Sequence, residues 1–335
     1  MSAQKIVVTG ASGFIGKHIT RELLDNGYAV VGTVRSTAKA DETREAVGSA
    51  HHDRLSFATV DLTSDDGWDD ALAGADGLVH SASPFPLGSP SDPDELIRPA
   101  VDGTLRAMRA AKAAGIDRVV LTSSCVAIYN DELRADQTML DETNWSPTRQ
   151  PFTSAYDDSK TLAERAAWDF VNEEAPEMTL ATVNPGVVWG EPLDTNYGAS
   201  LGLVERLLDG QDPMLPDLSF PVVDVADVAR MHRLALELDD AAGQRFPAAA
   251  GAMTMKEMAE ALNAEIPGSK AKTRLAPNWM VRLMARFNAE MKTVAPRLGR
   301  PGAVSGANAT EKLGIHFIAP RDALLSSARF IMANR

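Results

Sequence analysis

The sequence predicts an α/β fold, a doubly wound parallel sheet with a smaller C-terminal lobe. Through the first two-thirds of the chain, short β-branched runs alternate with segments whose apolar residues recur at helical spacing. This alternation is typical of right-handed βαβ crossovers and a parallel sheet. The chain has 335 residues, more than a single hydrophobic core usually serves, so a second and smaller unit is expected.

The predicted sheet lies in the N-terminal two-thirds. Residues 6–9 form the first β-branched run, and apolar residues then recur at helical spacing over 14–26 until Gly27 ends the helix. Further strands are expected at 29–34, 55–60, 77–80, 118–122 and 180–183, and the clearest helices between them at 95–114 and 155–174.

The pattern becomes less regular after Pro185, where further prolines interrupt short segments. We expect a loop-rich lobe with one strand, 220–223, returning to the main sheet and a surface loop at 297–302. Helices without regular strands between them are expected at 225–238, 255–264 and 279–292.

Composition excludes several classes of protein. A net charge of −13 argues against nucleic-acid partners, because phosphate binding needs a basic surface. The single cysteine, Cys125, excludes an intrachain disulfide framework and a cysteine-rich metal site, and we expect no bound metal. No signal-peptide pattern and no apolar run of about 20 residues are present. We therefore expect a cytoplasmic protein without a membrane partner.

A glycine-rich turn lies between the first strand and the first helix. Its sequence, TGASGFIG over 9–16, lets the backbone turn tightly and approach a pyrophosphate, while the helix N-terminus offers free N–H groups. The spacing is G-x-x-G-x-x-G rather than the standard G-x-G-x-x-G. A turn without a ligand is the alternative. We expect a bound dinucleotide and a Rossmann-type fold.

The residues after the second strand indicate which dinucleotide is bound. An acidic residue at this place binds a ribose hydroxyl, whereas arginine accommodates a 2′-phosphate. Arg35 follows the strand, Lys39 is near, and the first acidic residue is Asp41. Two cations favour NADP(H) over NAD(H), because a guanidinium grips phosphate with paired charged hydrogen bonds. The alternative is a solvated basic loop.

Tyr156 and Lys160 are four residues apart and share one helix face. A tyrosine pKa of about 10 is too high for acid–base catalysis at neutral pH, but an adjacent ammonium stabilises the phenolate and lowers the pKa. The spacing alone is common on helices. Ser123 and Ser124 end a predicted strand at the ligand-binding edge, where a hydroxyl can bond a substrate oxygen; local backbone bonding is the alternative.

Together these motifs resemble the extended short-chain dehydrogenase/reductase superfamily, of the NAD-dependent epimerase/dehydratase type. Within it the chain is most similar to dihydroflavonol reductase-like aldehyde and ketone reductases. The matches are dense over residues 5–190, and include HSASP at 80–84, DETNW at 141–145, SKTLAERAAW at 159–168 and NPGVVWG at 184–190.

The resemblance implies a role for each matched residue. Tyr156 is the implied proton donor, Lys160 lowers the tyrosine pKa and holds the nicotinamide ribose, and Ser124, with Ser123 as fallback, binds the carbonyl oxygen. Phe85 joins Ser124 and Tyr156 as a substrate-binding residue. The implied cofactor-binding residues are Gly10, Ser12, Gly13, Phe14, Ile15, Gly16, Arg35, Lys39, Asp61, Leu62, Ser81, Ala82, Ser83, Thr122, Tyr156, Lys160, Pro185, Gly186, Val187 and Val188.

The implied activity is NADPH-dependent reduction of an aldehyde or ketone to an alcohol. Residues 1–184 are then the NADP-binding Rossmann domain, with 220–250 returning to it, and 185–335 mainly the substrate-binding lobe. A small carbonyl or alcohol substrate and a monomer or homodimer are expected. The alternatives are a nucleotide-sugar epimerase or dehydratase with tightly bound NAD, and a non-catalytic NADP(H)-binding sensor.

The chain departs from the family pattern at two places. Asp102 stands where many members carry asparagine, which puts a four-residue proton relay in doubt. The Asn-Trp-Tyr-Cys motif of cinnamoyl-CoA reductases is missing near Tyr156, where residues 152–155 read FTSA. We therefore do not expect a CoA thioester substrate.

Overall fold

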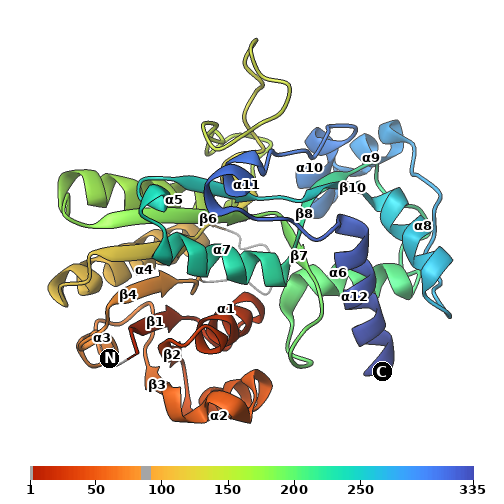
Figure 1. The fold of residues 1–335 in the computed structure, drawn as a ribbon. Helices are drawn as coiled ribbons and strands as arrows, with labels where there is room; N and C mark the ends of the chain where they lie inside the picture. Colours follow the sequence, from red (N-terminus) through yellow and green to blue (C-terminus); the bar gives the residue numbers. More distant parts are fainter. Residues whose placement is uncertain (1–2, 84–91) are drawn as a thin grey trace.

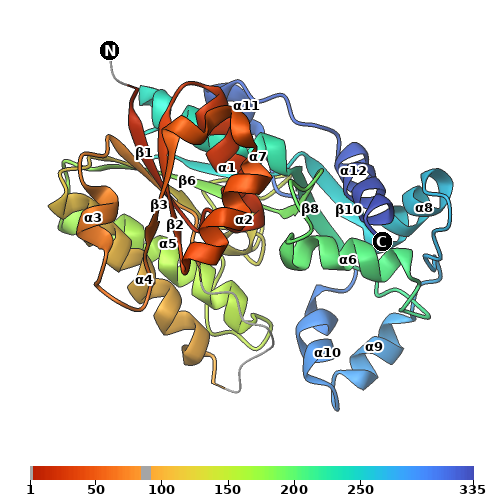
Figure 2. The same cartoon turned by 90° about the horizontal axis from the view of Figure 1, so that it is seen from below.

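A computed structural model describes residues 3–83 and 92–335 and shows a seven-stranded, wholly parallel sheet beside a smaller lobe (Figures 1 and 2). The strand order is β3-β2-β1-β4-β5-β6-β9, with the order reversing direction at β1 as in a Rossmann fold. The strands are β1 (Lys5–Thr9), β2 (Ala29–Val34), β3 (Leu55–Thr59), β4 (Gly77–His80), β5 (Arg118–Thr122), β6 (Thr179–Pro185) and β9 (Arg245–Ala248).

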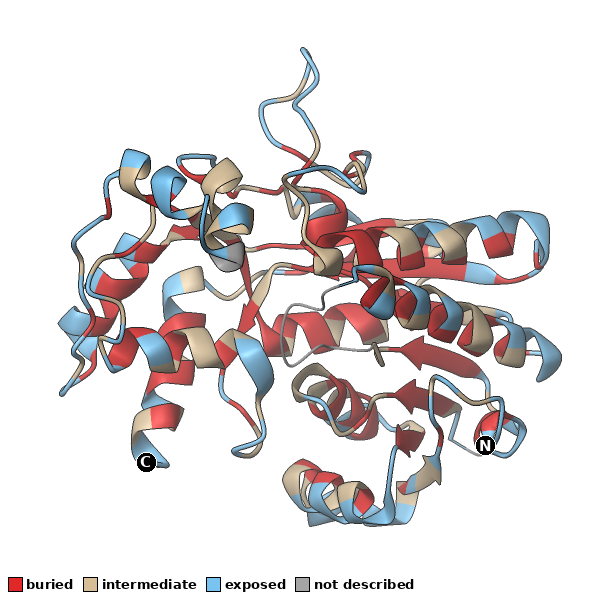
Figure 3. Cartoon of the chain, turned by 180° about the vertical axis from the view of Figure 1, so that it is seen from behind, coloured by how far each residue is buried: buried red, intermediate tan, exposed pale blue. Residues whose placement is uncertain are grey.

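Helices cover both faces of the sheet, and each face has its own apolar core. On one face α1 (Phe14–Asp25), α7 (Val225–Glu237) and α11 (Ala307–Leu313) pack on the sheet. On the other, α3 (Trp68–Leu72), α4 (Asp94–Ala113) and α5 (Ala155–Glu173) do so. Buried residues accordingly run along the strands and along the inner sides of these helices (Figure 3). Coverage of both faces explains why the strands show no apolar–polar alternation.

The smaller lobe is built on a second sheet of three strands, β7 (Val187–Trp189), β8 (Ser219–Asp224) and β10 (Gly251–Thr254). Their order is β10-β8-β7, in which β8 pairs parallel with β7 and antiparallel with β10. The core of the lobe is formed with helices α6 (Gly198–Leu208), α8 (Met255–Glu265) and α12 (Pro320–Ala333). The remaining elements are α2 (Thr37–Val47), α9 (Asn278–Met284) and α10 (Ala289–Val294), with short 3-10 turns at Ser49–Arg54, Cys125–Ala127, Asp239–Ala241 and Ala295–Arg297.

The predicted α/β architecture is confirmed. Strands occupy the predicted residues at 29–34, 77–80 and 118–122, and the bounds of α1, α4 and α5 lie within one residue of those expected. Within the described residues no helix combines the length and apolarity needed to cross a bilayer.

The C-terminal third differs from the prediction in two ways. The strand expected to return to the main sheet, 220–223, instead lies in the second sheet as part of β8, and β9 is the strand that joins β6. The apolar pattern of a short run does not reveal which strand it pairs with. In addition, β9 is only four residues long and contains a proline, so its sequence gives little sign of a strand. The helix expected over 279–292 is two helices, because Asn288 accepts a hydrogen bond from the Met291 amide and starts α10 afresh.

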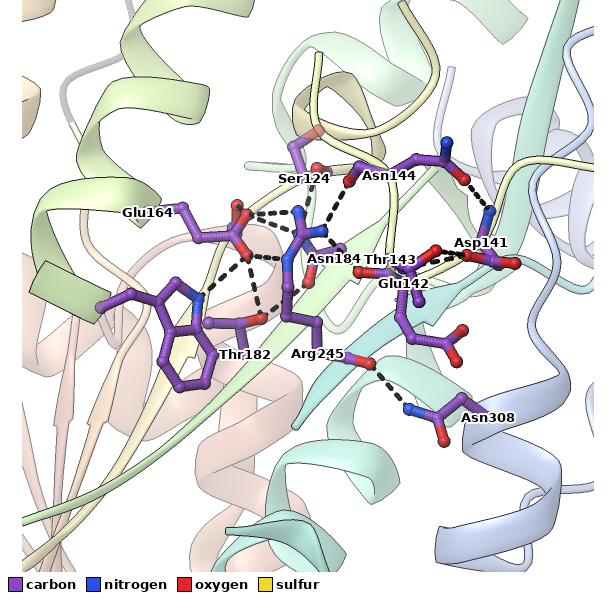
Figure 4. Close-up of polar contacts among 12 residues, drawn as sticks. Ser124, Asp141, Glu142, Thr143, Asn144, Glu164, Thr182, Asn184, Arg245 and Asn308 are labelled. Atoms are coloured by element: carbon purple, nitrogen blue, oxygen red, sulfur yellow. Dashed lines mark hydrogen bonds and ion pairs between the residues drawn. The ribbon is translucent and has the colours of Figure 1, made fainter. Parts of the chain in front are cut away.

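A buried ion pair joins α5 to β9 (Figure 4). The Glu164 carboxylate, whose side chain is 0% exposed, accepts a 2.6 Å hydrogen bond from Nε of Arg245. Arg245 also donates to the backbone carbonyls of Glu142 and Asn144, and its guanidinium lies 3.6 Å from the centre of the Trp145 ring. Arg245 therefore bonds the long loop after β5 to β9, which is an edge strand of the main sheet.

Glu164 is also the centre of a set of buried side-chain bonds. Ser123 donates to it at 2.5 Å and Asn184 at 2.7 Å, so β5 and β6 are held on either side of the carboxylate. Thr182 donates at 3.1 Å. A buried charge is tolerated only when it is paired and its remaining lone pairs are bonded, and both conditions are met.

We predict that Glu164→Gln lowers the free energy of unfolding by about 3 to 5 kcal/mol, because it leaves the Arg245 guanidinium buried and uncompensated. Urea denaturation measures the change. Glu173→Gln, an exposed substitution near the end of the same helix, is the matched control. Equal effects of the two substitutions would contradict the role given to the ion pair.

Candidate active site

The glycine turn after β1 packs directly against the chain after β4. Gly10 has φ +68°, and a Cβ there would lie 2.9 Å from the Cα of Ala82. A Cβ on Gly16 would lie 2.1 Å from the carbonyl oxygen of Gly10. Only glycine fits these two positions. Among the described residues no side chain caps α1, so the first N–H groups of the helix are available to an anion.

A cavity of about 430 Å³ opens over this turn at the carboxyl ends of β1 to β4. This edge is where open α/β sheets bind their ligands. The structure brings together here the predicted residues Gly10, Ser12, Gly13, Arg35, Asp61, Leu62, Ser81, Ala82 and Ser83. The sequence analysis missed Thr33, Val34, Val60 and Thr63, which follow from the strand ends only once the register is known.

The lining of this cavity fits a dinucleotide phosphate. The exposed Arg35 stands at its rim, and the Asp61 carboxylate is oriented by hydrogen bonds from the amide and hydroxyl of Thr63. These bonds hold the pKa of Asp61 below its usual value, and the nearby Arg35 charge adds to the effect. An uncapped helix N-terminus, a close backbone approach and an exposed guanidinium are the groups that a 2′-phosphorylated dinucleotide requires.

Several of the residues predicted to bind the cofactor do not line this cavity. Lys39 pairs with Glu42 on its own helix at 2.5 Å. Phe14 begins α1 and packs its ring edge-on against His18. Ile15 and Gly16 share that first helical turn, and Val188 is buried inside β7. Phe85 lies outside the described residues.

Ser124 and Tyr156 meet at a second cavity, of about 330 Å³, which Pro185, Gly186 and Val187 also line. A hydrogen bond joins the two hydroxyl side chains. Ser123, by contrast, donates to the buried Glu164. Neighbouring residues of an extended chain point to opposite sides, so only one of the two serines can face the cavity. The structure places Ser124 there.

The pKa of Tyr156 differs in direction from the expectation. Burial raises it to about 12, the hydrogen bond from Ser124 acts to lower it, and the Asp157 charge raises it further. Lys160 is not among the groups that shift it. The Lys160 pKa is itself lowered to about 8, because burial disfavours the charged ammonium more than the Glu164 charge favours it. The expected lowering of the tyrosine pKa is therefore not seen in this structure, where burial dominates, and the role of Lys160 stays a prediction.

Lys160 lies between the two cavities. It lines a small pocket together with Thr122, Ala82 and Ser83, and the last two residues also line the nucleotide cavity. The lysine thus stands one helical turn from the Tyr156 phenol and beside the segment after β4 that lines the nucleotide cavity. Thr104 also lines this pocket, whereas Asp102 is exposed on α4.

The smaller lobe supplies a wall that the sequence analysis missed. Phe220 and Arg297 line the cavity that Ser124 and Tyr156 face, which is the candidate catalytic cavity, and Arg297 forms an ion pair with Asp157, the residue after Tyr156. The two charges are separated by 140 residues in the chain, so no local pattern could reveal the contact. Among the described residues no group of three or more His, Cys, Asp or Glu side chains could hold a metal ion.

Comparisons with known proteins agree with this architecture. The model of the NAD dependent epimerase/dehydratase family matches residues 6–248. A ketoreductase of Aspergillus niger is 36% identical over 284 residues, which cover 79% of this chain and 83% of the relative. A putative NADPH-dependent methylglyoxal reductase of Candida albicans is 34% identical, covering 79% of this chain and 84% of the relative. A cinnamoyl-CoA reductase of Petunia hybrida is 35% identical, covering 80% and 79%.

Solved structures give the same result over almost the whole chain. The crystal structure of yeast methylglyoxal/isovaleraldehyde reductase complexed with NADPH superposes with a TM-score of 0.82 at 26% identity, covering 99% of each chain. Vestitone reductase from alfalfa has the same fold, with a TM-score of 0.77 at 24% identity and 98% of each chain covered. The resemblance inferred from the motifs is confirmed: the chain belongs to the NAD dependent epimerase/dehydratase family, and within it to the extended short-chain dehydrogenase/reductases that are similar to dihydroflavonol, cinnamoyl-CoA and methylglyoxal reductases.

Proposed function

We propose that this protein reduces an aldehyde or ketone to an alcohol with NADPH as the reductant. The observation that carries the proposal is the hydrogen-bonded pair Ser124–Tyr156 facing one cavity, while a second cavity opens over the glycine turn. When bound, the nicotinamide supplies the hydride. The relatives named as ketoreductase and NADPH-dependent methylglyoxal reductase support the same chemistry.

Tyr156 and Ser124 act on the oxygen of the reacting carbonyl. With a pKa of about 12 the phenol keeps its proton at neutral pH and can donate it to that oxygen. Ser124 donates a second hydrogen bond to the same oxygen, which strengthens as negative charge develops there. Lys160 holds the dinucleotide next to the phenol, and the bound dinucleotide is in turn oriented by the glycine turn.

Arg35 selects NADP(H). Its guanidinium is exposed at the rim of the nucleotide cavity, where it can form two charged hydrogen bonds with a 2′-phosphate. Ser124, Tyr156 and Lys160 are the catalytic residues of the proposal. Because the Asn-Trp-Tyr-Cys motif is missing, reduction of a CoA thioester is not expected, although cinnamoyl-CoA reductases are among the relatives.

The first test is NADPH oxidation by purified protein across aliphatic aldehydes, aromatic aldehydes, α-dicarbonyls and β-keto esters. Tyr156→Phe should lower kcat by at least about 100-fold, the effect of removing a general acid, while NADPH still binds. Tyr28→Phe removes a surface phenol that bonds Glu237 and is the control. Wild-type turnover in Tyr156→Phe contradicts the mechanism, and tightly retained NAD without carbonyl reduction would favour a sugar epimerase.

Cofactor preference tests the role of Arg35. Arg35→Gln should reduce the ratio of kcat/KM for NADPH to kcat/KM for NADH by roughly 10- to 100-fold, because it removes charged hydrogen bonds to the 2′-phosphate. Arg21→Gln, an exposed cation on α1, should leave the ratio as it is. An unchanged ratio in Arg35→Gln would mean that other residues determine any preference for NADPH over NADH.

The pH dependence tests Lys160. Its pKa of about 8 means that the ammonium is charged below pH 8 and loses its proton as the pH rises through that value. We expect kcat/KM for NADPH to fall over that range, since the charged form holds the dinucleotide, while the Tyr156 phenol stays protonated. Lys160→Arg should remove this alkaline limb. A flat wild-type profile across the range would contradict the assignment.

A further inference from the structure

Exposed apolar side chains are concentrated in one short stretch of the smaller lobe. Among the described residues seven large hydrophobic side chains are exposed, and five of them lie between residues 275 and 287. They are Leu275, Trp279, Leu283, Met284 and Phe287, of which Phe287 is 87% exposed. A single exposed apolar side chain is normal in a folded protein, but such a cluster marks a surface that binds a partner.

Three of these side chains lie along one side of α9. Backbone hydrogen bonds to the third or fourth preceding residue continue the helical path through 285–288. Trp279, Leu283 and Phe287 are four residues apart on this path and share one face, whereas the buried Val281 is on the opposite face. In Figure 2, α9 and α10 stand apart from α6, α8 and α12, so the apolar face belongs to a projecting part of the lobe.

The same stretch is strongly basic although the chain as a whole is acidic. Residues 270–300 contain eight of the 33 lysine and arginine residues but one of the 46 acidic residues, so they carry a net charge of +7 in a chain whose net charge is −13. Seven of the eight cations are exposed: Lys270, Lys272, Arg274, Arg282, Arg286, Lys292 and Arg300. The eighth, Arg297, forms the ion pair with Asp157.

The exposed cations are not neutralised within the chain. In the part of the chain that the structure describes, none of the seven forms an ion pair. Arg282 and Arg286 are four residues apart, so on α9 and the turn after it they form a basic stripe beside the apolar one. The lobe therefore presents cationic and apolar side chains next to each other on one exposed face.

This combination selects among the classes of partner. A symmetric contact with a second copy would bring two stretches of charge +7 together, which is unfavourable. A nucleic acid offers phosphates but no apolar interior for aliphatic side chains such as Leu283 and Met284. A bilayer with anionic lipids offers both, because its head groups carry negative charge and its hydrocarbon lies just beneath them.

We infer that residues 270–300 dock the smaller lobe on the surface of a bilayer that contains anionic lipids. Trp279, Leu283 and Phe287 enter the boundary between head groups and acyl chains, and the neighbouring arginines pair with lipid phosphates. The expectation of no membrane partner followed from the lack of a spanning run, and a helix that lies on the surface needs none. Since α9 packs against the turn Ala295–Arg297, and Arg297 lines the candidate catalytic cavity, docking brings that cavity close to the membrane.

Co-sedimentation of the full-length protein with vesicles tests this inference. Binding is measured at low salt with vesicles of phosphatidylcholine alone and with vesicles in which about one third of the lipid is phosphatidylserine. We expect binding to the mixed vesicles to be at least about 10-fold tighter, because several cations act together at an anionic surface. The difference should shrink as the salt concentration rises to about 1 M, where the Debye length is about 3 Å.

Charge variants show whether α9 is the docking site. Arg282→Gln combined with Arg286→Gln should weaken binding to the mixed vesicles by roughly 10- to 30-fold. The matched control is Arg21→Gln combined with Arg98→Gln, which removes two exposed arginines from α1 and α4 and should bind as the wild type does. All four side chains are exposed, so both double variants should keep the wild-type melting temperature.

An apolar variant separates docking from loose electrostatic adsorption. Phe287→Ser should weaken binding to the mixed vesicles by roughly 10-fold, because it removes a large apolar side chain that the bilayer would bury. Leu133→Ser changes an exposed leucine in the loop after β5 and is the control. Unchanged binding in Phe287→Ser overturns the inference, since charge alone would then hold the protein on the vesicle.

Equal or absent binding to the two kinds of vesicle overturns the inference, as does wild-type binding by the Arg282 and Arg286 double variant. Size-exclusion chromatography identifies a rival occupant. A concentration-dependent dimer that Phe287→Ser converts to a monomer would assign the face to a second copy instead. These measurements need no catalysis, so their failure leaves the proposed reductase function standing.

Discussion

The ion pair between Glu164 and Arg245 is the contact on which the site geometry depends. A single buried carboxylate holds the end of β6 through Asn184 and the start of β9 through Arg245 (Figure 4). It also holds the end of β5 through Ser123. The guanidinium in turn fixes the loop that carries Trp145. Segments spread over more than a hundred residues are thereby brought to one place next to the candidate catalytic groups.

This network also decides which side chains face the candidate catalytic cavity. Along the extended chain that leaves β5, Ser123 points to Glu164 and Ser124 to the catalytic cavity. The same division holds at the end of β6, where Asn184 bonds the carboxylate and Pro185 lines the cavity. A polar core on one side of the strand ends therefore orients the reactive groups on the other, as preorganised sites require.

Burial, rather than pairing, sets the protonation of the groups around the site. It raises the pKa of Tyr156 to about 12 and lowers that of Lys160 to about 8. His80, fully enclosed beside Thr9, has its pKa lowered to about 3, with the Lys160 charge as a secondary cause. An uncharged imidazole, a protonated phenol and a weakly held ammonium proton are the states that desolvation favours at neutral pH. The phenol is thus poised as an acid.

Sequence by itself determined the architecture, the glycine turn and the helix that carries Tyr156 and Lys160, because periodicity, turn chemistry and i,i+4 spacing act over short stretches of chain. Tertiary structure alone decided that β9 and not 220–223 joins the main sheet, that Ser124 and not Ser123 faces the cavity, and that Arg297 reaches Asp157. It also reversed the expected shift of the Tyr156 pKa. Strand partners, buried ion pairs and desolvation depend on residues distant in the chain, and no local pattern encodes such contacts.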